Sequence, residues 1–214
     1  MIKVTFLIND KNSWIKKFIK LNNLNFRKKY KFLFAFNHNK IKGQDIVFVL
    51  SYTKILSNNF LKKNKLNLVV HSSKLPKDKG FAPMSYQVLR GKNKIYNTMF
   101  KINENIDGGK ICLRNFFLLN GSELYEEIRE IQGKSINDLI TIFLKKFPNI
   151  IFREQKGKSN FNKRRKQDDS ELNINKSIKS QINLLRICDN KKFPAFFLFK
   201  GKKYFINIKR NNNE

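Results

Sequence analysis

Residues 45–71 read DIVFVLSYTKILSNNFLKKNKLNLVVH and hold two apolar runs, at 45–51 and 66–70. A short helical or irregular connection at 60–65 separates them. Strands that are buried on both faces read as continuous apolar runs, and such strands form parallel sheets covered by helices. We therefore predict two parallel strands, the second of which ends at His71. In sheets of this kind, ligands bind at the carboxyl ends of the strands.

The rest of the chain extends this α/β pattern. We predict further strands at 2–8, 30–36, 97–102 and 110–118, and helices at 14–21, 82–90, 122–132, 135–147 and 177–188. Ser135 and Asp138 fit a capping box at the start of one of these helices. Strand-like runs at 193–200 and 202–208 flank Gly201 and indicate a terminal hairpin.

Length and composition suit one domain with an appendage. The chain has 214 residues, and a hydrophobic share of 41% allows a sizeable core. The stretch 153–169 is polar and nearly free of apolar residues, which is typical of a linker or mobile loop. We expect a catalytic domain at 1–150, a basic linker or loop at 151–170, and a helix-and-hairpin subdomain at 171–214.

The net charge of +29 raises the question of a nucleic-acid partner. Lys far exceeds Arg, and Asn, Ile and Phe are abundant while Ala occurs only three times. All the favoured residues have A/T-rich codons, and the lysines are scattered along the chain. Genome composition therefore explains much of the charge, and nucleic acid stays open as a partner without being favoured.

Targeting and metal signals are absent from the sequence. The two cysteines, Cys112 and Cys188, have no metal-type spacing, and no window approaches the ~20 apolar residues of a membrane span. The first ten residues alternate like a strand and do not read as a signal peptide. We expect a reduced, cytoplasmic protein without structural disulfides or a metal ion.

Two titratable residues lie in loops with turn chemistry. His71 opens the run 71–83, which contains Leu75-Pro76 and Gly80, and Asp107 precedes two glycines. A carboxylate before two glycines is typical of a tight turn where backbone or ligand comes close. Together these residues point to acid–base chemistry on a cofactor-sized ligand.

The motifs Ser51-Tyr-Thr-Lys-Ile-Leu, His71-Ser-Ser-Lys-Leu-Pro with Gly80-Phe-Ala-Pro, and Ile106-Asp-Gly-Gly-Lys-Ile resemble those of the folate-dependent formyltransferases. The resemblance covers roughly residues 47–145. It also extends into the tail, through the run from Arg164 to Asn173, Leu185-Arg186 and Phe193-Pro-Ala-Phe-Phe. It implies a Rossmann-like, mostly parallel sheet, followed here by a short C-terminal helix and β-hairpin.

The resemblance also implies a reaction. An amine attacks the formyl group of 10-formyltetrahydrofolate, so an oxyanion needs a donor and the amine needs a base. His71 would serve the formyl oxygen, while Asp107 would orient His71 and accept the proton. Seven residues would line the folate site and shape its loops: Ser51, Tyr52, Ile55, Leu56, Leu75, Pro76 and Gly80.

One position departs from the family. The usual Asn two residues before the catalytic His is Val69 here. Asn67 lies on the same strand face but about 6–7 Å further back, so it could replace that Asn only if the strand end bends. Ser72 is another candidate donor.

The short tail makes the chain look most like formyltransferases of nucleotide-linked amino sugars, with formylation of methionyl-tRNA as the alternative. A third reading, prompted by Val69, is a non-catalytic protein that binds RNA or another polyanion. Asn9 and Asp10, at a strand end, and Arg164 and Arg165, as a diphosphate clamp, are candidate acceptor-binding residues. The terminal hairpin could also supply the edge of a homodimer.

Overall fold

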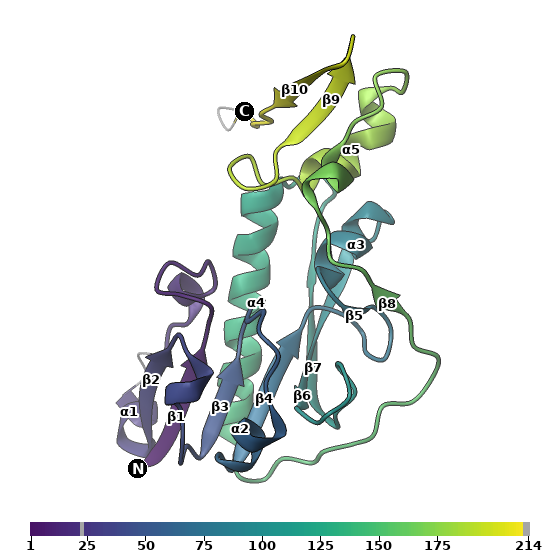
Figure 1. Ribbon diagram of the computed structural model, residues 1–214. Coiled ribbons are helices and arrows are strands. Elements are labelled where there is room, and N and C mark those ends of the chain that lie inside the picture. The colour runs from purple at the N-terminus through teal and green to yellow at the C-terminus, as the bar shows by residue number, and fades with distance from the viewer. Residues whose placement is uncertain (22–23, 212–214) are drawn as a thin grey trace.

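A computed structural model describes residues 1–21 and 24–211. Its centre is a six-stranded sheet in the order β2-β1-β3-β4-β6-β7 (Figure 1). The first four strands in this order run parallel, and β6 and β7 are antiparallel to their neighbours. The bounds of the six strands are β1 Ile2–Leu7, β2 Tyr30–Ala35, β3 Ile46–Val49, β4 Leu66–His71, β6 Lys94–Lys101 and β7 Ile111–Leu118. The predicted α/β class with a mostly parallel sheet is confirmed.

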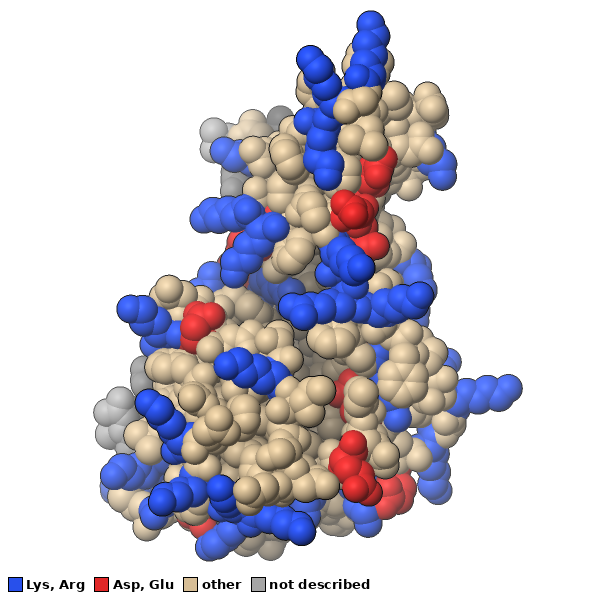
Figure 2. Space-filling view, viewed as in Figure 1, with Lys and Arg blue, Asp and Glu red and all other residues tan. Residues whose placement is uncertain are grey.

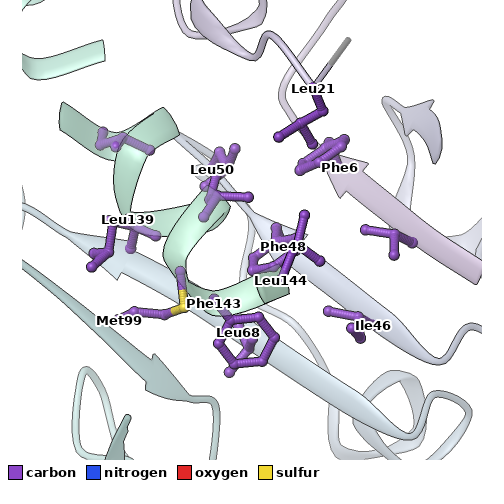
Figure 3. Close-up of a cluster of buried hydrophobic side chains, with 14 of the residues drawn as sticks. Phe6, Leu21, Ile46, Phe48, Leu50, Leu68, Met99, Leu139, Phe143 and Leu144 are labelled. Atoms are coloured by element: carbon purple, nitrogen blue, oxygen red, sulfur yellow. The ribbon is translucent and has the colours of Figure 1, made fainter. Parts of the chain in front are cut away.

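The long helix α4 (Tyr125–Lys146) packs its apolar side on one face of this sheet. Figure 3 shows Leu139, Phe143 and Leu144 of α4 beside strand residues such as Phe48 and Leu68. The ring centroids of Phe48 and Phe143 lie 5.5 Å apart in an edge-on contact. Both rings are fully buried, and each such burial contributes about 1.5–3 kcal/mol.

Two helices were predicted where α4 runs unbroken, so that prediction is wrong. Ser135, predicted as a cap, is buried inside the helix, and its hydroxyl accepts a hydrogen bond from Asn97 Nδ2 at 3.0 Å. Gly133, between the two predicted helices, lies against the ring of Phe18, where a β-carbon would come within 2.2 Å of that ring. Tertiary contacts, and not a helix end, account for both residues.

The predicted helix at 14–21 is also wrong. Only a 3-10 turn, η1 (Lys16–Phe18), forms there, and the helix α1 (Leu24–Lys29) follows. The amide of Lys20 donates to Asn137 Oδ1 on α4, at 2.9 Å, instead of to a carbonyl one turn back. The apolar spacing arises because Ile15 and Leu21 are buried separately against the core.

Short elements surround the loops that follow the parallel strands. They are η2 (His38–Lys40), α2 (Asn58–Lys62), β5 (Lys79–Gly80), α3 (Pro83–Leu89), β8 (Phe161–Asn162) and η3 (Gln167–Ser170). Of these, α2 packs on the sheet face opposite α4, with Phe60 against Val47 and Val49, whereas α3 packs on the α4 side. Strand β8 pairs with β5, so the segment predicted as a linker or mobile loop is tied to the loop after His71.

The chain then forms α5 (Ile178–Arg186) and a hairpin of β9 (Ala195–Phe199) and β10 (Lys202–Ile206), as predicted. This helix and hairpin lie beyond one end of α4 (Figure 1). The last three positions of the predicted subdomain at 171–214 lie outside the described residues. Within the described chain, no helix is both long and apolar enough to cross a membrane.

Candidate active site

His71 is the last residue of β4, and its side chain is only 8% exposed. Its Nε2 lies 2.7 Å from the carbonyl oxygen of Asp78, across the loop that starts at His71. A carbonyl can only accept a hydrogen bond, so Nε2 must carry a proton. Nδ1 is therefore the nitrogen left for chemistry, and in the neutral ring it is an acceptor.

Nδ1 of His71 faces the Asp107 carboxylate, with 3.7 Å between Nδ1 and Oδ2. This distance is too long for a hydrogen bond. In the neutral ring, two acceptors would face each other across the gap. The arrangement is favourable when a proton donor lies between them or when His71 is protonated. Asp78, and not Asp107, makes the hydrogen bond that orients the ring.

Asp107 is fixed by the backbone around it. Its Oδ2 accepts a hydrogen bond from the amide of Gly80 at 2.7 Å, and its own φ is +47°. At Gly109, a β-carbon would lie 1.6 Å from the carbonyl oxygen of Lys101, so only glycine fits. The two glycines thus let the chain turn tightly and bring the carboxylate to His71.

Asp78 is a second acidic residue at the site and is 4% exposed. Its Oδ1 lies 2.5 Å from Arg90 Nη2, and it also accepts weaker hydrogen bonds from Asn160 and Asn162. These hydrogen bonds fix the position of Asp78, and therefore of the Asp78 carbonyl that orients His71.

The polar segment 151–162 completes the support of both loops. Nε2 of Gln155 donates to the carbonyls of Asp107 and Gly109, at 2.7 and 2.9 Å. Sequence reasoning missed Asp78, Gln155 and the two asparagines. The alternation Asn160-Phe161-Asn162 was the available signal, since it is the pattern of a strand with one polar face.

Replacement of Gly80 by Ala should loosen this support. Gly80 has a φ of +86°, and a β-carbon would meet the Asn162 carbonyl oxygen at 2.6 Å. We expect the free energy of unfolding to fall by about 2 kcal/mol or more, and the 151–162 segment to become sensitive to protease.

Gly201→Ala is the matched control for Gly80→Ala. Its φ of +72° is similar, but nothing lies within 4 Å of the added β-carbon. Chemical denaturation of both variants separates backbone strain from the clash. Equal losses of stability would show that the clash with Asn162 in the β5–β8 contact adds nothing to the loss caused by backbone strain.

The loop predicted to hold the cofactor follows β3. His38 Nδ1 lies 2.8 Å from the Tyr52 hydroxyl, and Ser51 Oγ accepts from Trp14 Nε1 at 2.8 Å. Leu56 is partly buried against the core on this face, whereas Ile55 is 92% exposed. Next to Asp107, Ile106 is 66% exposed. The two loops thus present apolar side chains that nothing in the described chain covers.

Asn67 does not take the place of the missing Asn. Its Nδ2 donates to the carbonyl of Leu61 in α2 at 2.9 Å, while its buried Oδ1 has no partner in the described chain. Strand β4 keeps regular pairing with β6 up to His71 opposite Thr98, so the strand end does not bend. Four residues along a strand correspond to about 13 Å, which keeps Asn67 away from the imidazole.

Ser72 points the other way from His71. Its hydroxyl donates to Asn97 Oδ1 at 2.7 Å and accepts from Gln132 Nε2 at 2.6 Å, both on the α4 side of the sheet. Residues 71 and 72 alternate across the strand, so Ser72 supports the sheet and not the reacting groups.

The candidate acceptor residues have separate partners. Asn9 Oδ1 accepts from the Thr53 amide at 3.0 Å and so holds the 51–56 loop, while Asp10 caps the amide of Asn12. The Arg164 guanidinium lies 5.7 Å from the centre of the Phe81 ring, whereas Arg165 donates to the Asp169 carbonyl. The structure does not bring the two arginines to a common ligand.

Two loop-shaping predictions can be located in the same way. Leu75 is 2% exposed, and Pro76 beside it is partly buried, so these side chains shape the loop between His71 and Asp78. Among the described residues, no group of three or more His, Cys, Asp or Glu side chains could hold a metal ion.

Comparison with known proteins shows extended similarity. The model of the family described as formyl transferase matches residues 3–130. The methionyl-tRNA formyltransferase of Fervidobacterium nodosum is 30% identical over 145 residues, which are 68% of this chain and 46% of that protein. The chain thus spans about half the length of the curated relatives it matches.

Solved structures share the fold over the whole chain. A methionyl-tRNA formyltransferase from Clostridium thermocellum superposes with a TM-score of 0.83 at 20% identity, covering 100% of this chain and 96% of that one. A sugar N-formyltransferase from a Shewanella species gives 0.72 at 17% identity and covers 100% of both chains.

Proposed function

Because the chain belongs to the formyl transferase family, we propose that it is a folate-dependent N-formyltransferase with its reacting groups at His71 and Asp107. One observation carries this proposal. The Asp78 carbonyl occupies Nε2 of His71 and leaves Nδ1 facing the Asp107 carboxylate across 3.7 Å. A donor and a base on either side of a narrow gap are what transfer of an acyl group to an amine requires.

The two side chains have complementary roles. Protonated His71 donates from Nδ1 to the formyl oxygen, where negative charge develops as the acceptor nitrogen attacks. Asp107 accepts the proton that the amine loses and returns it to the departing nitrogen, so the new C–N bond forms first and the old C–N bond then breaks. Val69 supplies no hydrogen-bond donor, which leaves His71 as the side-chain donor to the oxyanion.

The residues present fit a folate ligand. The exposed side chains of Ile55 and Ile106, with Tyr52 and Leu56 beneath the first loop, suit a flat heterocycle. When bound, 10-formyltetrahydrofolate supplies the formyl group. The chain's own part is to hold that ligand between the 51–56 loop and the Asp107 loop.

For the acceptor, we propose the amino group of methionyl-tRNA. The curated relative at 30% identity carries that name, and the net charge of +29 suits a polyanionic substrate. The amino group of a nucleotide-linked amino sugar, favoured in the sequence analysis, is the second candidate. It is kept because a sugar N-formyltransferase has the same fold.

An acceptor assay tests this choice. The purified protein, given 10-formyltetrahydrofolate, should formylate methionyl-tRNA, as detected by mass spectrometry of the released amino acid. Uncharged tRNA is the blank, and a panel of nucleotide-linked amino sugars runs in parallel. Product only with a sugar would move the proposal to the second candidate. Calorimetric titration with a folate analogue tests the non-catalytic reading, since no heat of binding would favour it.

A further inference from the structure

A groove lies beside the loop that follows His71 and shares Leu75 and Pro76 of that loop with the site described above. Its volume is about 620 Å³, which lies within the range of about 300–1,000 Å³ that is typical of ligand cavities. Three segments enclose it: residues 74–77 of the loop, residues 111–114 of the outer strand β7, and residues 151–158. We call it the basic groove.

The basic groove concentrates positive charge. Lysines and arginines are spread over the whole face in Figure 2, so a surface cation marks no site by itself. Six of the fourteen groove residues are basic, against 45 of 214 in the chain. These six are Lys74, Lys77, Arg114, Arg153, Lys156 and Lys158.

The cations of the basic groove are not balanced by acids. Its one acidic residue, Glu154, pairs with Lys110 outside the groove at 3.0 Å. None of the six basic side chains forms an ion pair with a carboxylate of the described chain. Like charges around one cavity repel each other, so an anionic ligand would be stabilised there.

The other lining residues indicate how that anion is recognised. The groove has no aromatic, amide or hydroxyl side chain; the remaining residues are Leu75, Pro76, Ile111, Cys112, Leu113, Ile151 and Gly157, besides Glu154. Stacking rings and amide groups are what proteins use to read bases. Charge without such groups fits a phosphate backbone.

We propose that the basic groove binds the phosphodiester backbone of the RNA acceptor without regard to base sequence. This inference rests on the proposed tRNA acceptor. Residues 74–77 lie in the loop that follows His71, and Gln155, between Glu154 and Lys156, donates to the carbonyl of Asp107. RNA bound in the groove therefore lies against the two segments that hold the reacting groups.

Paired substitutions test the basic groove. Lys156→Ala with Lys158→Ala should weaken binding of uncharged tRNA about tenfold, measured by fluorescence anisotropy. The slope of log affinity against log salt should become less negative by about 1.4–1.8, as two phosphate contacts are lost. In turnover, KM for methionyl-tRNA should rise while kcat and folate-analogue affinity stay the same.

The matched control is Lys176→Ala with Lys179→Ala. These lysines are also exposed, but they lie at the start of α5 and outside the groove. The inference predicts that the control pair changes the salt slope far less than the groove pair. Equal effects of the two pairs would overturn it, as would a marked preference among tRNA-length RNAs of different sequence.

The assay separates this inference from the acceptor proposal. If the wild-type protein formylates methionyl-tRNA and the groove double variant behaves like the control double variant, only the groove inference is wrong. If the wild-type protein formylates an amino sugar and not methionyl-tRNA, the acceptor proposal is wrong and the groove inference falls with it.

Discussion

Replacing His71 by Ala, or Asp107 by Asn, should lower kcat/KM for formyl transfer by about 10²–10⁴-fold. In the proposed mechanism His71 donates to the formyl oxygen from Nδ1, and Asp107, whose Oδ2 lies 3.7 Å from that nitrogen, is the base. Single-turnover kinetics with a saturating folate donor measure the chemical step. Circular dichroism and folate-analogue titration should show an intact fold and ligand site in both variants.

Two further variants at position 71 test which nitrogen acts. The amide of Asn reaches about as far as Nδ1 of His, whereas the amide of Gln reaches about as far as Nε2. His71→Asn should therefore keep more activity than His71→Gln. Asp138→Asn, an exposed acid on α4, is the control and should match the wild type. Wild-type turnover in the Ala or Asp107→Asn variant would refute the proposed roles.

Loss of Arg186 should cost about 3–5 kcal/mol of folding free energy, because it leaves a buried carboxylate without its partner. Arg186 is 2% exposed on α5, and its Nη2 lies 3.3 Å from Glu123 Oε2 in the loop before α4. Its Nε also donates to the Glu123 carbonyl at 3.1 Å. The Arg186–Glu123 pair thus connects α5 to the loop before α4, and so to the central sheet and α4.

Denaturant unfolding of Arg186→Ala, followed by circular dichroism, measures this loss. Lys134→Ala is the control, because the Lys134–Glu130 pair on α4 is solvent-exposed and should contribute little. An Arg186→Ala protein as stable as the control would show that the buried pair does not hold the subdomain.

The same pair predicts a dependence on pH. Burial acts to raise the pKa of Glu123, but hydrogen bonds from the backbone amides of Asn120 and Gly121, with the Arg186 charge, hold the pKa below its ordinary value. A lowered folded-state pKa means that this stabilisation is present above about pH 4.3, the unfolded value, and is lost as pH falls through the folded value. The stability gap between wild type and Glu123→Gln should therefore shrink on acidification.

Much of the architecture could be predicted because hydrophobic spacing is a local signal. The continuous apolar runs that end at Val49 and His71 specified buried parallel strands, and the Gly201 turn specified the hairpin. The turns around His71 and Asp107 could be predicted equally well, because a turn that contains glycine depends on residues adjacent in the sequence. Periodicity failed at 14–21 and at Gly133, where distant contacts with α4 decide the backbone.

By itself, the sequence determined the order of the strands along the chain, the two side chains that we propose to react, and the charge of the surface. Only the tertiary structure decided which nitrogen of His71 is free, because that depends on the Asp78 carbonyl seven residues away. It also turned the polar segment 151–162 from an expected linker into the support of Asp107, and set six cations around one groove. Hydrogen bonds and charges act through space, so partners remote along the chain leave no pattern in the local sequence.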